Sequence, residues 1–279
     1  MTEHLLIGLL WLLPKNWVSA MAGRFAKSRL SRPLIRPFAQ RFQINLEEAS
    51  LPIEAYETLL DFFVRELKPG VRPIAADENL MVSPVDGRVA QFGRLDRGEL
   101  IQAKGHTYTA AALLANEAEA KRFEGGQYIT IYLSPQDYHR IHTPAAGQVV
   151  GATYIPGKLW PVNQAGVNRV PGLFAINERL VTYLQSQLGR IAMVKVGATI
   201  VGSVKVVYDE TLGTNKAGAQ VELKVITDGP LLDKGAEIGR FEFGSTVILL
   251  VEPGDWEWAP EVTHGARLRL GQPLLRKRA

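Results

Sequence analysis

The sequence predicts an α+β protein in which a helical N-terminal region precedes a mostly antiparallel β core. Two observations predict this class. Apolar residues recur at helical spacing from Leu46 to Leu67, and Lys68-Pro69-Gly70 ends the pattern. After Arg72-Pro73, short β-branched runs alternate with Gly, Pro and Asp, as in strands joined by tight turns. We therefore expect a helical region over residues 1–70 and a β-rich body over residues 71–279.

A short apolar segment, LLIGLLWLLP from Leu5 to Pro14, opens the N-terminal region. As a helix of roughly ten residues it would be about 15 Å long, half of the ~30 Å hydrocarbon core, so it cannot cross a bilayer. It could be the apolar part of a signal peptide, with Val18-Ser19-Ala20 as the cleavage site, but the preceding MTEH lacks Lys and Arg. We expect a retained anchor that lies in the membrane interface.

Basic residues crowd the segment around and after the anchor, interleaved with bulky apolar residues such as Trp17, Phe25 and Phe38. They are Lys15, Arg24, Lys27, Arg29, Arg32, Arg36 and Arg41. The pattern predicts an amphipathic, membrane-facing surface that binds anionic lipid, and a solvated helical face packed on the rest of the protein is the alternative. Nucleic-acid binding is the weaker interpretation, because the cations come with aliphatic residues instead of a series of aromatic stacking positions.

Composition limits the class of protein further. The 279 residues are 46% hydrophobic and 22% charged, which is typical of a globular protein and argues against both disorder and a polytopic membrane protein. The chain has no cysteine, which excludes disulfides, Cys-ligated zinc and a cysteine nucleophile. The formal net charge of +4 fits an anionic partner.

The β body is predicted to consist of strands with two intervening helices, at Thr109 to Ala120 and at Ile176 to Leu188. There is no repeat of solenoid period and no Gly-rich phosphate loop of the P-loop or dinucleotide type. The strand segments read MVSPVDGRVAQFG, YITIYLSP, GQVVGATYIPG, IAMVKVGATIVGSVKVVY, AQVELKVITDG and STVILLVEPG.

Two polar clusters of the body are ambiguous when taken alone. Asp86 stands before a glycine in SPVDGRV, and an ordinary Asp-Gly turn explains most such pairs. His139 and His142 lie three residues apart in LSPQDYHRIHTPAAG. Without Cys or clustered acids they form a poor zinc signature, so we predict no metal site and favour acid and base catalysis. Two loop histidines without a role are the alternative.

The third cluster is Gly244-Ser245, which precedes the most hydrophobic run of the chain. Glycine weakens a strand, so its presence here has a reason other than stability. Alternatively, the Gly-Ser pair marks a bulge in the strand. A serine with a histidine and a carboxylate forms an activated nucleophile, and Asp86, His142 and Ser245 could supply one. The G-x-S-x-G elbow and the βαβ pattern of α/β hydrolases are absent, which argues against a conventional hydrolase.

Taken in order, these segments resemble the phosphatidylserine decarboxylase proenzymes of the bacterial, membrane-associated type. The resemblance covers most of the chain after the anchor, with one departure: Phe243 stands where the family's Leu-Gly-Ser-Thr motif has Leu, and the Gly-Ser bond is unchanged. The segments that carry it are FFVRELKPGVRPI, SPVDGRV, IQAKGHTYTAAALL, YLSPQDYHRIHTPAAG, GKLWPVN, FAINERL, VGATIVGSV and KGAEIGRFEFGSTVILL.

The resemblance implies a chemistry for the Gly-Ser pair. The Ser245 hydroxyl attacks the Gly244 carbonyl with Asp86 and His142 as triad partners, and the resulting ester is lost by β-elimination. The products are a large chain, residues 1–244, and a small chain, residues 245–279, which begins with a pyruvoyl group and stays associated with the large one. We expect the cleaved protomers to pair further as a homodimer. This pyruvate cofactor would condense with the amino group of phosphatidylserine and accept the electrons released with CO2, as pyridoxal phosphate does elsewhere.

Further roles also follow from the resemblance. His139 is the candidate proton donor in decarboxylation, and His142 serves mainly in self-cleavage, although the residues themselves allow the reverse. Trp160 and Asn163 of GKLWPVN are candidate lipid contacts, and an ordinary packed loop is the alternative. A lipid substrate gives the anchor a purpose and places the protein peripherally at the cytoplasmic face of the inner membrane.

Two other classes remain open at this point. A membrane-associated serine hydrolase with the same Asp86, His142 and Ser245 would stay a single chain. A non-catalytic β module with a membrane anchor would tolerate Ser245→Ala without any change in chain size.

Overall fold

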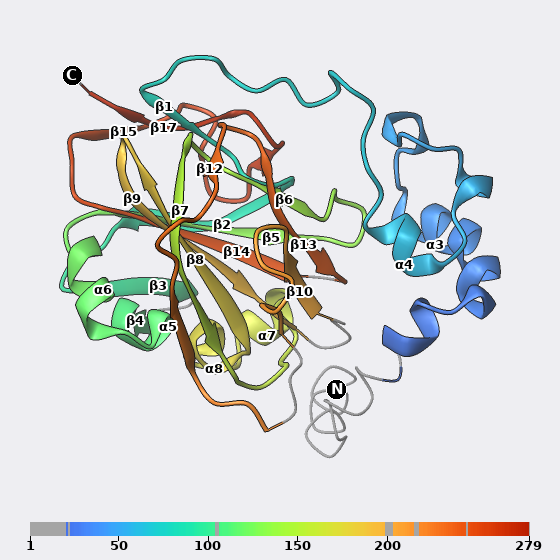
Figure 1. Ribbon diagram of the computed structural model, residues 1–279, viewed down its shortest axis with the longest axis horizontal. Coiled ribbons are helices and arrows are strands. Elements are labelled where there is room, and N and C mark those ends of the chain that lie inside the picture. The colour runs from blue at the N-terminus through green and yellow to red at the C-terminus, as the bar shows by residue number, and fades with distance from the viewer. Residues whose placement is uncertain are drawn as a thin grey trace.

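The computed structural model describes residue 21 and residues 23–103, 106–198, 203–214, 218–243 and 245–278, and for residue 245 it describes the backbone. The predicted anchor from Leu5 to Pro14 lies outside these residues. Within the described part of the chain, no helix is long and apolar enough to cross a membrane. The helices of the N-terminal region lie to one side of the β body, at the right of Figure 1.

The described N-terminal region contains short helices packed on one small apolar cluster that includes Ile35 and Phe62. The predicted helical pattern from Leu46 to Leu67 is divided among three of them, because Pro52 is extended and Thr58 starts a new helix by accepting a hydrogen bond from the Asp61 N–H. The helices are η1 (Arg29–Leu34), α3 (Ile35–Phe42), η2 (Leu46–Glu48), η3 (Ile53–Ala55) and α4 (Leu59–Phe63).

A nine-stranded sheet with antiparallel pairing forms the centre of the β body and confirms the predicted β core. Its order is β11 (Glu222–Val225), β7 (Gly147–Ile155), β8 (Arg179–Ser186), β9 (Gly189–Val196), β14 (Ser245–Val251), β5 (Gln127–Leu133), β2 (Gly87–Arg94) and β16 (Arg267–Leu268), and β12 (Leu231–Leu232) also pairs with β7. The strand that begins at Ser245 therefore lies inside the sheet, between β9 and β5.

Smaller sheets and helices complete the body. One sheet has the order β10 (Ser203–Val206), β13 (Glu237–Glu242) and β6 (Arg140–His142), and another has β1 (Leu80–Val82), β17 (Pro273–Lys277) and β15 (Trp256–Trp258). A hairpin joins β3 (Glu99–Ala103) to β4 (His106–Thr109), and the remaining helices are α5 (Ala110–Leu114), α6 (Glu117–Phe123), α7 (Gln164–Val167) and α8 (Leu173–Ile176).

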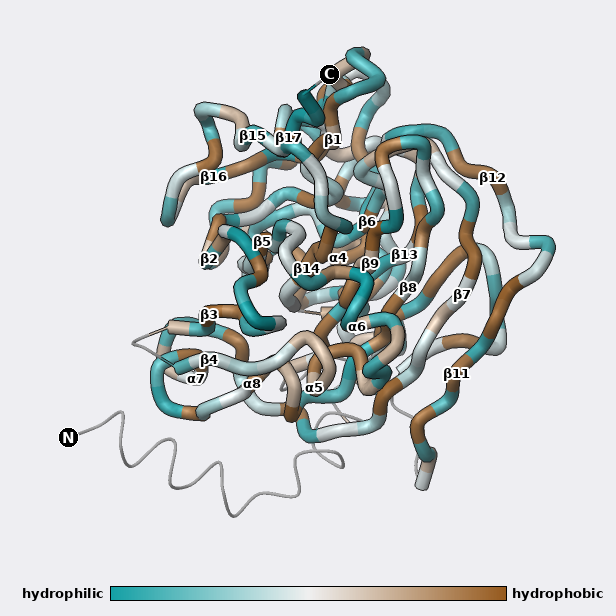
Figure 2. The backbone as a smooth tube through the Cα atoms, turned by 90° about the vertical axis from the view of Figure 1, so that its left-hand side faces the viewer, coloured by the Kyte–Doolittle hydropathy of each residue, from teal (hydrophilic) through white to brown (hydrophobic). Residues whose placement is uncertain are grey.

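The central strands β5, β8, β9 and β14 are buried on both faces, which explains why they are hydrophobic without alternation. In β14, Val247 and Leu249 belong to the core on one face, whereas Ile248 and Leu250 belong to the core on the other. Figure 2 shows hydrophobic residues along this strand and its neighbours. The sequence STVILLV is thus the signature of an interior strand.

The structure corrects one predicted helix and divides another. The helix expected over residues 176–188 is wrong: α8 ends at Ile176, and β8 follows and pairs with β7 and β9. Strand neighbours on both sides override the helical propensity of this segment. The helix expected from Thr109 to Ala120 is confirmed as α5 and α6, which are separated by Ala115 in the left-handed conformation.

Lys195 is a fully buried amine in β9 whose removal is expected to stabilise the protein. It donates hydrogen bonds to Thr182 Oγ1 at 2.5 Å and to the Met193 carbonyl at 3.1 Å, and within the described residues no carboxylate pairs with it. Burial lowers its pKa from 10.5 to about 7. Between pH 10.5 and about 7, the lysine is protonated in the unfolded chain but neutral in the folded protein. Its cost to the stability of the folded protein therefore grows as the pH falls through this range and is constant below it.

We therefore expect Lys195→Met to raise the free energy of unfolding at pH 7 by roughly 2–4 kcal/mol. Guanidinium unfolding at pH 7 and pH 9.5 checks this, with the exposed Lys121→Met as the control. The gain must be smaller at pH 9.5. An equal gain at both pH values would mean that packing, and not the buried amine, is responsible.

Candidate functional site

The junction between β13 and β14 is the centre of the candidate site. Phe243 and residue 244 are the only residues between the two strands, which belong to different sheets. Phe243 has φ +87°, a left-handed conformation that costs a residue with a side chain about 1–3 kcal/mol. Its ring packs on Phe63 of α4 with ring centroids 4.6 Å apart. Backbone strain is therefore observed directly before the Gly244-Ser245 bond.

His139 lies beside this junction. Its ring stacks on Phe63 at 4.0 Å, so that Phe63 contacts both His139 and Phe243. The His139 carbonyl accepts a hydrogen bond from the Phe241 N–H, and its ring contacts the carbonyl of Ser134, the residue that follows the β14 partner Leu133. These contacts hold the imidazole between the end of β5 and the end of β13.

The hydrogen bonds of His139 determine which ring nitrogen is free. Nε2 lies 3.1 Å from the Ser134 carbonyl, and because a carbonyl only accepts, Nε2 carries the hydrogen. Nδ1 is then an acceptor, and it is buried without a hydrogen-bond partner among the described residues. Burial, together with the nearby positive charge of Arg65, lowers the pKa of His139 to about 3. His139 is thus a neutral base with one free lone pair.

His142 has a different environment from His139. It lies opposite Glu237 in the pairing of β6 with β13, several residues before the junction. Its Nδ1 lies 2.7 Å from the Gly235 carbonyl and must donate to it, so Nε2 accepts a hydrogen bond from the Tyr138 hydroxyl at 3.2 Å. Burial lowers the pKa of His142. Both ring nitrogens are therefore occupied.

Asp86 is a buried carboxylate held by a network of its own. It lies in the tight turn ahead of β2, and Gly87 is required there because a Cβ would lie 2.6 Å from the Tyr132 carbonyl oxygen. The Arg72 guanidinium donates to both carboxylate oxygens, with the shortest contact at 2.7 Å, and the Leu270 N–H donates to Oδ1 at 2.8 Å. The carboxylate is fully engaged by these donors.

The structure brings Asp86 and His142 into one neighbourhood but forms no hydrogen bond between them. The His142 N–H donates to the carbonyl of Pro84, two residues before Asp86. Tyr138 connects the two, because it lines a cavity together with Asp86 and donates its hydroxyl to His142. The structure describes only the backbone of Ser245, so the triad of Asp86, His142 and Ser245 stays a prediction.

Replacing Tyr138 by Phe is expected to raise the pKa of His142. The tyrosine hydroxyl donates to the neutral form of the imidazole, and a hydrogen bond to the neutral form disfavours protonation. An NMR titration of the His142 ring protons in Tyr138→Phe checks the shift, with Tyr208→Phe, whose hydroxyl bonds Thr182 and not His142, as the control. An unchanged His142 titration would show that the hydroxyl does not act on Nε2.

The GKLWPVN loop is packed in the structure. Trp160 is buried in the core on one face of the sheet, and its backbone is bound on both sides by the Asn177 side chain, at 3.0 Å and 2.8 Å. Asn163 is exposed and caps α7 by accepting a hydrogen bond from the Gly166 N–H. These are structural roles, and lipid contact by either residue stays a prediction.

Sequence reasoning did not identify Phe63, Arg65, Arg72 and Tyr138 as site residues. All four stand within or beside segments that carried the family resemblance, FFVRELKPGVRPI and YLSPQDYHRIHTPAAG. An aromatic or arginine side chain has no local pattern that distinguishes a site role from packing. Their proximity to the acid and base groups could be found only in three dimensions.

Known proteins are similar to this chain over nearly its full length. A family model described as phosphatidylserine decarboxylase matches residues 59–276. A relative named phosphatidylserine decarboxylase proenzyme, from Anaeromyxobacter sp. (strain K), is 50% identical over 98% of this chain and 99% of its own length. A protein of the same name from Brevibacillus brevis is 48% identical over 100% of both chains. Another, from Myxococcus xanthus, is 45% identical over 98% of this chain and 99% of its own length. The chain therefore belongs to the phosphatidylserine decarboxylase family.

Proposed function

We propose that this chain cuts itself between Gly244 and Ser245 and that the product decarboxylates phosphatidylserine to phosphatidylethanolamine and CO2. Family membership supports the reaction. The observation in the structure that carries the proposal is the strained junction at Phe243 with the unpartnered Nδ1 of His139 beside it. Strain before the bond and a free base next to it are what self-cleavage and proton transfer require.

Self-cleavage converts one peptide bond into two chain ends. The Ser245 hydroxyl adds to the Gly244 carbonyl, the C–N bond breaks, and an ester replaces the amide. A base removes the α proton, the ester leaves as the Gly244 carboxylate, and hydrolysis of the dehydroalanine releases ammonia and leaves the pyruvoyl group. We assign the first proton to His142 with Asp86 as its partner. His142 must then exchange its Tyr138 hydrogen bond for the Ser245 hydroxyl, and its Nδ1 must exchange the Gly235 carbonyl for Asp86.

Nδ1 of His139 has no hydrogen-bond partner within the described chain, so it is available to exchange a proton near residue 245, where the family resemblance puts the pyruvoyl group. The pyruvoyl group supplies the electron sink for the loss of CO2. The substrate ammonium must lose its proton to react, and solvent takes that proton because Nδ1 is too weak a base to do so; Nδ1, once transiently protonated, is acidic enough to give a proton to the carbon that CO2 has left. A low pKa keeps this nitrogen free until the substrate arrives.

The small chain remains in place after cleavage because its first strand is paired on both sides. Thr246 to Val251 of β14 pair with β9, and Ser245 to Val251 pair with β5. β16 and β17 of the same chain pair with β2 and β1 of the large chain. The large and small chains therefore form a heterodimer held by hydrogen bonds and core packing.

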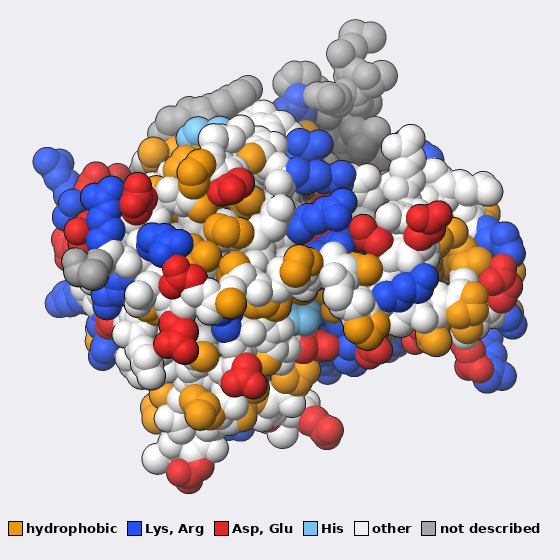
Figure 3. Space-filling model, turned by 90° about the horizontal axis from the view of Figure 1, so that it is seen from above, with side chains coloured by type: hydrophobic (Ala, Val, Ile, Leu, Met, Phe, Trp, Pro, Cys, Tyr) orange, Lys and Arg blue, Asp and Glu red, His pale blue; other side chains and the backbone are white. Residues whose placement is uncertain are grey.

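The N-terminal region supports a peripheral location on the membrane. It exposes apolar side chains, among them Leu30 at 79%, beside cations such as Arg32. Blue cationic, red acidic and orange hydrophobic side chains are interspersed at the right of Figure 3. Lys27 of this region bonds Glu242 at 2.7 Å, two residues before Gly244. A membrane contact would thus be linked directly to the cleavage junction.

Intact mass and CO2 release test the proposal together. Purified protein is analysed under denaturing conditions, and carboxyl-labelled phosphatidylserine in detergent micelles is the substrate. We expect two fragments, the smaller one lighter than a serine-initiated peptide by about the change from serine to a keto acyl group, and labelled CO2. A single uncut species with esterase activity would instead support the serine hydrolase.

A further inference from the structure

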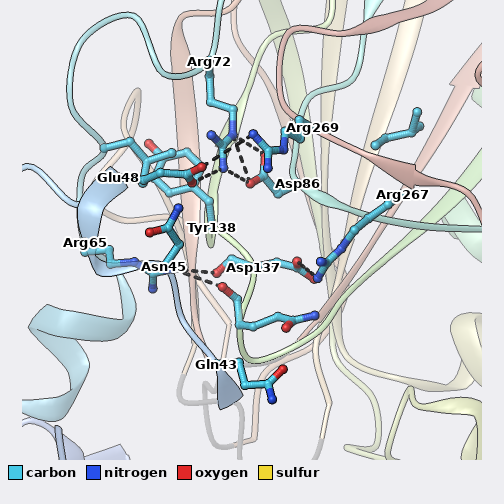
Figure 4. Close-up of a pocket in the computed structure, with 13 residues that line it drawn as sticks. Gln43, Asn45, Glu48, Arg65, Arg72, Asp86, Asp137, Tyr138, Arg267 and Arg269 are labelled. Carbon is cyan, nitrogen blue, oxygen red and sulfur yellow. Dashed lines mark hydrogen bonds and ion pairs between the residues drawn. The ribbon is translucent and has the colours of Figure 1, made fainter. Parts of the chain in front are cut away.

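A polar cavity of about 120 Å³ lies between the N-terminal region and the β body (Figure 4). Residues of five chain segments line it, namely 43–48, 65–72, Asp86 in the turn ahead of β2, 136–138 in the loop after β5, and 267–269 at β16. The roles proposed above do not use the cavity itself, although Asp86 and Tyr138 stand in its wall.

The charged residues around the cavity do not balance. Four cations face three anions, so the wall carries one net positive charge. The cations are Arg65, Arg72, Arg267 and Arg269, and the anions are Glu48, Asp86 and Asp137. A cavity walled by low-dielectric protein concentrates such a charge.

Each carboxylate is already paired with an arginine other than Arg65. The Arg72 guanidinium bridges Glu48 and Asp86, at 2.7 Å to each. Arg267 pairs with Asp137 at 3.1 Å, and Arg269 pairs with Glu48 at 3.5 Å. Figure 4 shows these contacts on opposite sides of the space between them. The excess positive charge is therefore that of the remaining arginine.

Arg65 is the cation without a carboxylate. It is 4% exposed, and its Nη2 donates to the carbonyls of Gln136 at 3.2 Å and Asp137 at 3.4 Å. Its Nε and Nη1 are buried and have no hydrogen-bond partner among the described residues. These two nitrogens expose almost no surface, so an anion in the cavity would act on the guanidinium charge without contacting them. A buried guanidinium without a paired carboxylate is costly, and a nearby anion would offset that cost.

We propose that this cavity binds one phosphate-type oxyanion, either free inorganic phosphate or the phosphodiester of a phospholipid. Arginines match such oxyanions because their N–H groups form a planar fork. The volume is that of about four water molecules, enough for a phosphate group. The bound anion would connect the N-terminal region, the body and the small chain, because these parts contribute Arg65, Arg72 and Arg267, respectively.

Phosphate-dependent stability of the uncut Ser245→Ala chain tests this independently of any enzymatic activity. Thermal unfolding is followed with increasing inorganic phosphate at constant ionic strength, with chloride as the reference anion. If the anion is free phosphate, the midpoint rises on the order of 5 °C at a phosphate concentration 100 times the Kd. Arg267→Gln and Arg65→Gln abolish the rise, whereas Arg94→Gln, an exposed arginine elsewhere, retains it.

A second experiment distinguishes free inorganic phosphate from the phosphodiester of a phospholipid. Binding of the same variants to vesicles of phosphatidylglycerol and phosphatidylcholine is measured by sedimentation. If the anion is a lipid phosphodiester, phosphate leaves the midpoint unchanged and Arg267→Gln weakens vesicle binding several-fold relative to Arg94→Gln. Arg267 is half-exposed, so this variant remains informative if Arg65→Gln does not fold. The proposal is overturned if Arg267→Gln behaves like Arg94→Gln in both experiments.

Discussion

A Ser245→Ala variant is expected to remain one chain of 279 residues and to release no CO2 from phosphatidylserine. Alanine has no hydroxyl to add to the Gly244 carbonyl, so the ester cannot form and no pyruvoyl group is produced. Decarboxylation needs that electron sink, and the loss of activity is therefore complete. Denaturing mass spectrometry and a CO2 assay on the same sample measure both effects.

The strand pairing allows a clean control for this variant. Ser186→Ala removes a hydroxyl at the end of β8, where it accepts a hydrogen bond from the Leu188 N–H, far along the sheet from the junction. This variant should cut and react like the unmodified chain. Cleavage of Ser245→Ala at the same bond would show that another nucleophile acts, and the proposed mechanism would be wrong.

His139→Gln is expected to cut itself but to decarboxylate about 10²–10⁴ times more slowly, the usual contribution of a positioned acid or base. Glutamine can keep the hydrogen bond to the Ser134 carbonyl but offers no basic nitrogen where Nδ1 stands. His142→Gln is expected to show the opposite behaviour and remain uncut, because it lacks the base that activates Ser245. Fragment masses and single-turnover CO2 release separate the two steps.

The outcome decides between the two assignments of the histidines. His264→Gln, an exposed histidine beside Phe92, serves as the control and should leave both steps unchanged. If His139→Gln stays uncut while His142→Gln cuts, His139 is the base of self-cleavage. The structure makes that reversal chemically reasonable, because His139 lies beside the junction and His142 has both nitrogens occupied.

Backbone strain at Phe243, directly before the proposed cleavage bond, is a physical reason why this Gly-Ser bond would react. Phe243 is held at φ +87° by its packing on Phe63 and by the strands on either side. We expect cleavage at this bond to release the strain, because the large chain would then end at residue 244. Relief of about 1–3 kcal/mol would favour the forward reaction without any contribution from the triad.

Features with a local cause could be read from the amino-acid sequence. The uninterrupted apolar run STVILLV indicates an interior strand, and Asp86-Gly87 is a dipeptide typical of tight turns. The Gly244-Ser245 pair and the two histidines lie in short contiguous motifs, and it was the resemblance of these motifs to a known family that predicted the cleavage bond and the candidate acid and base groups.

The tertiary structure alone decided which partners these groups have. Asp86 is bound by Arg72 instead of His142, and the proton of His142 Nδ1 is directed by the carbonyl of Gly235, 93 residues away in the chain. The segment of residues 176–188 became a strand for the same reason, because β7 and β9 supplied its hydrogen bonds. Protonation, strain and strand pairing depend on neighbours that folding brings together from distant segments, and no local pattern encodes them.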